Sequence, residues 1–168
     1  MLIAVNILKD MKLIELWFTV PGKDNFHILN PRNLLTLLTH ICGHKDWNHF
    51  LNNFMLILVI GPMLEENYGS RSLLLMIIIT ALVTGILNVI FFQTGLRGAS
   101  GVVFMMILLS SFTNFSRGEI PYTFILVLVL YMGIQIKDSF ANNEISQFAH
   151  IVGGLCGSFF GFFRPRKQ

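Results

Sequence analysis

Five long stretches without a charged residue divide this chain, and they constrain its fold more than any other feature. The uncharged runs cover residues 50–64, 72–96, 98–116, 120–136 and 145–163. A helix needs about 20 apolar residues, with a range of roughly 17–25, to cross the hydrocarbon core of a bilayer. Four runs fall in that range, and the shortest becomes a full span when the polar residues at its two ends are added. The chain is therefore predicted to be an integral, multi-pass membrane protein.

The composition agrees with lipid as the solvent of these segments. Hydrophobic residues make up 54% of the 168 positions and charged residues only 12%, about half of the ~25% found in soluble domains. The 16 phenylalanines add apolar surface that a soluble domain of this size could not bury. We expect an all-α membrane bundle of five to six transmembrane helices in a single domain.

The ends and the connections complete the predicted organisation. Residues 1–20 are apolar but interrupted by charges, so they form either a short first span or a helix lying in the membrane interface. Residues 21–45 make a long first loop, in which residues 33–40 are expected to form a short helix with its leucines against the membrane. Five spans follow within residues 46–163, and a basic tail occupies residues 164–168.

The last span carries a histidine at the head of a row of glycines. His150, Gly153, Gly157 and Gly161 lie within about 80° of one another around a helix. Glycines four residues apart allow another backbone to approach closely. Whatever packs against these glycines also meets the imidazole. On its own, such a histidine is better explained as a packing residue bonded to a backbone carbonyl.

Ser100 offers a partner for that histidine. It stands between Gly98 and Gly101 at the start of a span, after a short loop. A serine at such a position usually caps the helix, but its hydroxyl becomes a nucleophile when a base removes its proton. His150 lies on the same predicted side of the membrane, so the two side chains are expected to meet at a similar depth.

Two more polar residues begin a span on that side. His49 and Asn53 are four residues apart and about 40° apart around the helix, so both can donate to the oxyanion that forms during acyl transfer. The alternatives are a packing pair, or a metal site of His40, His44 and His49. The metal alternative lacks HExxH, CxxC and a carboxylate at ligand spacing. No metal and no other cofactor is predicted.

In their order and spacing, these residues resemble the rhomboid family of intramembrane serine proteases. The matching pieces are His44, His49-x-x-x-Asn53, Gly61-x-x-x-Glu65-x-x-x-Gly69, Gly98-x-Ser100-Gly101 and Ala149-His150-x-x-Gly153-x-x-x-Gly157. Each motif alone is a weak signal. The ordered set, separated by span-length segments over residues 40–163, is a specific one.

The resemblance implies a role for each position. Ser100 would be the nucleophile and His150 its general base, in a dyad without an acidic third member. His49 and Asn53 would join the Ser100 backbone N–H in holding the oxyanion. Phe104 stands where the family often has a tyrosine, and its ring can still stack on the histidine. Structural roles near the site would fall to His44, Glu65, Gly98, Gly101, Gly153 and Gly157.

The implied activity is cleavage of transmembrane protein substrates within the lipid bilayer, in the plasma membrane of a prokaryote. Residues 137–147 would cover the site, and the span at 120–136 would face entering substrates. Nucleic acid is not an expected partner, because the basic residues sit at span ends. The main alternative is a rhomboid-like pseudoprotease that binds membrane clients without cutting them, and the intact serine and histidine disfavour it. A small transporter or channel would carry charges or broken helices inside its spans.

Overall fold

The structure, a computed structural model, describes residues 11–113, 122, 125–126, 129 and 144–163. Within these residues every regular element is helical, which confirms the predicted all-α class. The α-helices are α2 (Met11–Trp17), α3 (Pro31–Thr39), α4 (Trp47–Tyr68), α5 (Ser70–Phe91), α6 (Ser100–Ser110) and α8 (Glu144–Phe163). Two short 3-10 helices, η1 (Lys23–Asn25) and η2 (His40–Cys42), lie in the first loop.

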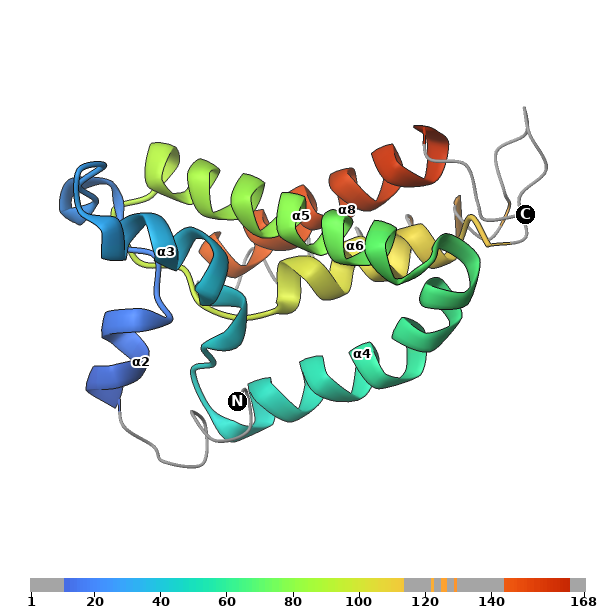
Figure 1. Ribbon diagram of the computed structural model, residues 1–168, viewed down its shortest axis with the longest axis horizontal. Helices are drawn as coiled ribbons and strands as arrows, with labels where there is room; N and C mark the ends of the chain where they lie inside the picture. Colours follow the sequence, from blue (N-terminus) through green and yellow to red (C-terminus); the bar gives the residue numbers. More distant parts are fainter. Residues whose placement is uncertain (1–10, 114–121, 123–124, 127–128, 130–143, 164–168) are drawn as a thin grey trace.

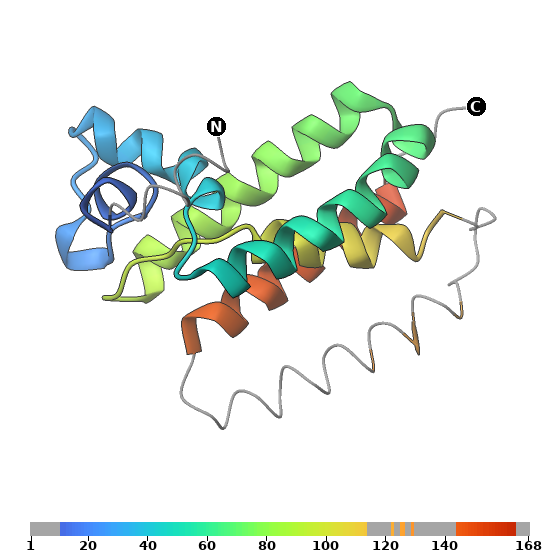
Figure 2. The same ribbon diagram turned by 90° about the horizontal axis from the view of Figure 1, so that it is seen from below.

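Helix α6 lies at the centre of the bundle. Figures 1 and 2 show α4, α5 and α8 running alongside it. All nine residues from Gly101 to Leu109 are buried, and none of them has a polar side chain. A helix that is apolar on every side belongs in the interior of a bundle. The helix that begins with Ser100 is therefore the element around which the others are arranged.

The described helices differ in how well they could cross a membrane. Among them, α5 alone is both long enough and apolar enough by length and composition. Helix α6 and residues 147–163 of α8 are shorter apolar helices. Helix α4 is as long as α5, with 22 residues. Polar side chains in the first two turns of α4 and at its end lower its hydropathy. The predicted span at 120–136 falls mostly outside the described residues.

A single residue joins α4 to α5. Gly69 has a φ of 80°, a conformation that favours glycine, and its N–H donates to the Glu65 carbonyl oxygen at 2.8 Å. The Ser70 hydroxyl donates to the Glu65 carboxylate at 2.6 Å. Glu65 thus closes this turn with both its backbone and its side chain, at the opposite end of α4 from His49.

Helix α3 begins where its sequence dictates. The side-chain oxygen of Asn30 accepts the N–H of Arg32 at 3.0 Å, and Pro31 occupies the first helical position, which its fixed φ suits. The helix predicted at 33–40 therefore starts two residues earlier. Leu37 is buried against α5. That contact corrects the expectation that all the leucines of this helix face the membrane.

The structure describes the N-terminal segment from Met11 onward. Helix α2 covers Met11–Trp17 within the described residues. The chain then bends, and Val20 exchanges two backbone hydrogen bonds of 2.9 and 3.0 Å with Leu96 in the α5–α6 connection. Residues 1–10 lie outside the described part of the chain, so the choice between a short first span and an interfacial helix for residues 1–20 stays a prediction.

Candidate active site

Ser100 is the first residue of α6, and the connection before it is held in place by its neighbours. The Gly98 N–H donates to the His40 carbonyl oxygen at 3.0 Å. Gly98 has a φ of 127°, and a Cβ added there would lie 2.8 Å from Cε1 of His49. Both the backbone conformation and the imidazole therefore require glycine at this position.

The glycine row of α8 packs directly on α6. A Cβ added to Gly153 would overlap the carbonyl oxygen of Gly101, and one added to Gly157 would overlap the α6 backbone one turn further on. This is the close backbone approach that small residues permit, and the element that packs on the glycines is the helix that begins with Ser100. Since Gly101 follows Ser100 and Gly153 lies one turn after His150, the same contact sets the spacing of the two side chains.

The imidazole of His150 is held by stacking. Its ring lies parallel to the ring of Phe104, with 4.1 Å between centroids and an angle of 4° between planes. Phe104 lies one turn after Ser100 on α6, so it presents its ring on the same face as the hydroxyl. The expected stacking of Phe104 on the histidine is confirmed, and it restricts the ring that would act as a base.

A bulky residue in the glycine row should therefore damage activity more than folding. Gly157→Leu must push α8 away from the Met105 carbonyl and so shift His150 relative to Ser100. Because a misplacement of ~1 Å can lower a rate about 10²-fold, we expect a loss of that order in cleavage of a transmembrane peptide, measured per folded molecule. Ser158→Leu, on a half-exposed face, is the control. Equal activity of the two variants would contradict this role of the glycines.

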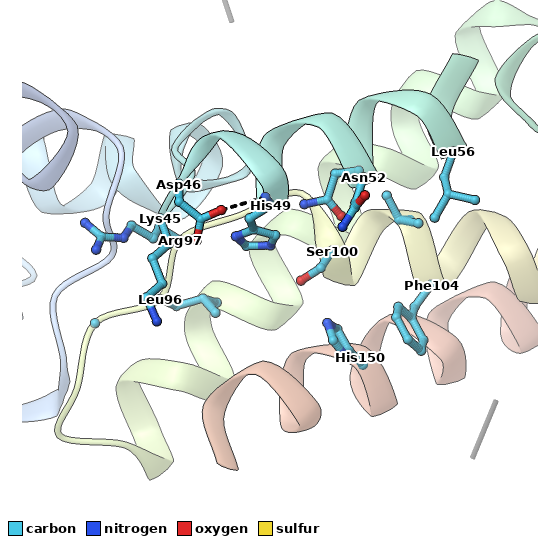
Figure 3. Close-up of a pocket in the computed structure, with 13 residues that line it drawn as sticks. Lys45, Asp46, His49, Asn52, Leu56, Leu96, Arg97, Ser100, Phe104 and His150 are labelled. Atoms are coloured by element: carbon cyan, nitrogen blue, oxygen red, sulfur yellow. Dashed lines mark hydrogen bonds between the residues drawn. The ribbon is translucent and has the colours of Figure 1, made fainter. Parts of the chain in front are cut away.

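A cavity of about 520 Å³ brings the predicted residues together. Ser100, His150, His49 and Asn53 all line it. Figure 3 shows the Ser100 side chain between the rings of His49 and His150, with Phe104 beyond the latter. A hydroxyl and an imidazole on one wall, facing hydrogen-bond donors on the other, is an arrangement suited to acyl transfer.

The α4 wall of the cavity is organised by a helix cap. The carboxylate of Asp46 accepts the backbone N–H of His49 at 2.8 Å, and this N-cap fixes the first turn of α4. Asn53, one turn later, is only 6% exposed. Among the described residues its Nδ2 has no hydrogen-bond partner. A buried amide left unpaired costs about 1–3 kcal/mol, a cost that a bound substrate oxygen would remove.

Two further histidines, His40 and His44, lie in the first loop, and His44 packs against this wall. The ring of His44 packs edge-on against His49 and Phe50, at 5.2 and 5.3 Å between centroids. Burial, with a smaller contribution from His49, lowers the pKa of His44 to about 4. Burial likewise lowers the pKa of His40 to about 4. Both rings are neutral at physiological pH, and an uncharged ring can be packed in the interior without a counter-ion.

The structure gives His40 a structural place that the sequence did not suggest. Its Nδ1 lies 3.2 Å from the Thr36 carbonyl oxygen, and its Nε2 lies 3.5 Å from the Thr84 hydroxyl. The ring therefore links α3 to α5. From the sequence, His40 was a candidate only as a metal ligand together with His44 and His49. No pattern in the sequence indicated its contact with Thr84.

The cavity also contains residues that sequence reasoning missed. Lys45, Arg97 and Asn52 line it, and Figure 3 shows the charged residues at one end, with Leu56 and Phe104 at the other. Asn52 is three residues from His49, a spacing that places side chains on neighbouring faces of a helix. That spacing was a usable signal. Of the predicted cover at 137–147, residues 137–143 lie outside the described residues, and residues 144–147 belong to α8.

Comparison with known proteins gives this arrangement a context. A family model described as "Rhomboid domain" matches residues 31–167. "Rhomboid protease GlpG" of Haemophilus influenzae is 24% identical over 134 residues, which cover 78% of this chain and 70% of the relative. "Rhomboid protease GluP" of Bacillus subtilis is 30% identical over 74% of this chain and 24% of its own length. "RHOMBOID-like protein 1" of Arabidopsis thaliana is 26% identical over 84% and 37%. The chain thus spans well under half of the last two.

Proposed function

The chain belongs to the rhomboid family of integral membrane proteins, and on that premise we propose that it is a serine endopeptidase that cleaves peptide bonds in or beside the transmembrane segments of other membrane proteins. One observation carries the proposal. The hydroxyl of Ser100 and the imidazole of His150 line a single cavity, and the imidazole is stacked on Phe104. A serine becomes nucleophilic only beside such a base.

The proposed reaction begins with attack of the Ser100 hydroxyl oxygen on the scissile carbonyl carbon, while His150 takes the hydroxyl proton. The carbonyl oxygen becomes an oxyanion. Ser100 opens α6, so its own backbone N–H has no partner within the helix and points out of the helix start. This N–H, His49 and Asn53 are the proposed oxyanion donors. His150 then gives its proton to the leaving amine as the C–N bond breaks, which leaves an acyl-enzyme.

Hydrolysis of the acyl-enzyme needs water, and the charged end of the cavity supports a route for it. Lys45, Asp46 and Arg97 line that end, and solvated side chains such as these keep water close to Ser100. His150 again acts as base, taking a proton from the water that attacks the ester carbonyl. The bond to Ser100 breaks, and the hydroxyl recovers its proton from His150. Besides the attacking water, these steps use side chains and backbone groups of this chain.

Labelling of the detergent-solubilised protein with a fluorophosphonate probe tests the proposal. The probe should form a covalent bond to the Ser100 oxygen, located by mass spectrometry of the modified peptide, and Ser100→Ala should not react. A probe bound at another residue would overturn the assignment of the nucleophile. Complete lack of reaction, together with retained binding of transmembrane peptides, would favour the alternative of a protein that binds membrane clients without cutting them.

A further inference from the structure

One polar side chain of the cavity has no role in the reaction proposed above. Asn52 lines the cavity together with His49 and Ser100, and Figure 3 shows it on α4 between His49 and Leu56. Around the helix it lies about 60° from His49 on one side, while Asn53 lies about 40° away on the other. The Asn52 side chain is exposed, whereas that of Asn53 is buried.

The surroundings of Asn52 on α4 are apolar. Met55 and Leu56, the residues one turn along, are exposed hydrophobic residues. A polar side chain on such a face is costly in a bilayer unless it has a partner. Within the part of the chain that the structure describes, the Asn52 amide makes no hydrogen bond. Asn67, also exposed on α4, instead donates to the Met63 carbonyl oxygen at 2.8 Å. Asn52 thus keeps a donor and an acceptor available to the cavity.

The substrate segment that is cleaved carries backbone groups that can pair with the Asn52 amide. To place a peptide bond against Ser100, a transmembrane helix must open, and its freed N–H and C=O groups then lack partners in a medium without water. The side-chain amide of asparagine has the same pairing of donor and acceptor as a peptide group. It can therefore bond to an extended backbone whatever side chains the substrate carries.

The spacing along α4 indicates which part of the substrate Asn52 meets. Residues three apart on a helix have Cβ atoms about 5–6 Å apart, and an extended chain advances about 3.3 Å per residue. If His49 holds the scissile carbonyl oxygen, Asn52 reaches a peptide group one or two residues away. Asn52 lies further from the charged end of the cavity than His49 does (Figure 3), so that group is on the side leading into the bilayer.

We propose that Asn52 is a substrate-binding residue that hydrogen-bonds the substrate backbone one or two residues from the scissile bond, on the side that continues into the bilayer. The inference rests on the proposed function and deepens it. The contact is to the substrate backbone and not to its side chains.

Backbone-ester substrates test this contact. In a synthetic transmembrane peptide, single amide N–H groups near the cut are replaced by ester oxygens, and each analogue is cleaved by the purified full-length protein. One ester position should raise KM roughly 3- to 10-fold with little change in kcat, the size of effect expected from one neutral hydrogen bond. Asn52→Leu should raise KM for the all-amide peptide by a similar factor. For this variant, the ester at that position should cause no further rise in KM.

Asn48→Leu is the matched control, because Asn48 is exposed on the same helix but does not line the cavity. It should keep both the normal KM and the response to the ester. Asn52→Ser, with a smaller side chain, should lose the ester response as Asn52→Leu does. If both Asn52 variants retain the full ester effect at every position, the proposed contact is overturned. The function itself is tested separately by probe labelling of the unaltered protein, so its failure would be recognised independently.

Discussion

Alanine in place of Ser100 should lower kcat for cleavage of a transmembrane peptide by about 10⁴-fold or more, the scale measured when a serine protease loses its nucleophile. His150→Ala should have a comparable effect, because a serine hydroxyl without a base is almost never ionised at neutral pH. KM should change little in either variant, since neither side chain is needed to hold the substrate. The measurement is a single-turnover rate at saturating substrate.

The losses of kcat caused by the two substitutions should not multiply in the double variant. In the proposed mechanism Ser100 and His150 act as one unit in proton transfer, so the double variant should be about as slow as either single variant. Ser110→Ala is the matched control, because this serine ends the same helix and bonds back to the Ile107 carbonyl oxygen at 2.7 Å. It should cleave at the normal rate. If the double variant instead loses the product of the two single-variant losses in kcat, the serine and the histidine act independently.

Much of this site could be predicted from the sequence because its key contacts are local patterns repeated on single helices. The glycine row on α8 requires only a period of 3.6 residues to be recognised, and its partner is defined by the small residues beside Ser100. The spacing of His49 and Asn53 likewise places both side chains on one face without any tertiary information. Helical periodicity thus placed side chains on one face of a single helix, whereas the meeting of Ser100 and His150 was predicted from their side of the membrane and from the resemblance to the rhomboid family.

Tertiary contacts decided what the sequence could not. After the span in the uncharged run 72–96 a connection is expected at residues 93–97, and α5 ends at Phe91. Beyond it, the Asn88 side chain donates to the Thr94 carbonyl oxygen at 3.1 Å, and Leu96 pairs with Val20. These contacts come from the fold, and they leave no mark in the charge pattern. The buried place of Leu37 against α5 had the same cause, since hydrophobicity alone does not distinguish a lipid contact from a helix contact.

Alanine at Asn53 should lower kcat roughly 10²–10³-fold, the usual effect of losing one oxyanion donor, while KM stays nearly constant. An oxyanion exists only once the carbonyl has been attacked, so its donor stabilises the transition state and contributes little to substrate binding. The melting temperature should change little, because among the described residues Nδ2 of Asn53 has no bond to lose. Its burial strengthens the contact that forms during the reaction, since water competes poorly for the amide.

Asn88→Ala separates this behaviour from ordinary loss of a buried amide. Asn88 is as well buried as Asn53, but its Nδ2 already donates to the Thr94 carbonyl oxygen at 3.1 Å. Its removal should lower the melting temperature, and any loss of activity should follow the loss of folded protein. Suppose that Asn53→Ala behaves in this way too, with a sharply lower melting temperature and a normal kcat in the folded fraction. Asn53 would then be a packing residue, and the oxyanion would depend on His49 and the backbone N–H of Ser100.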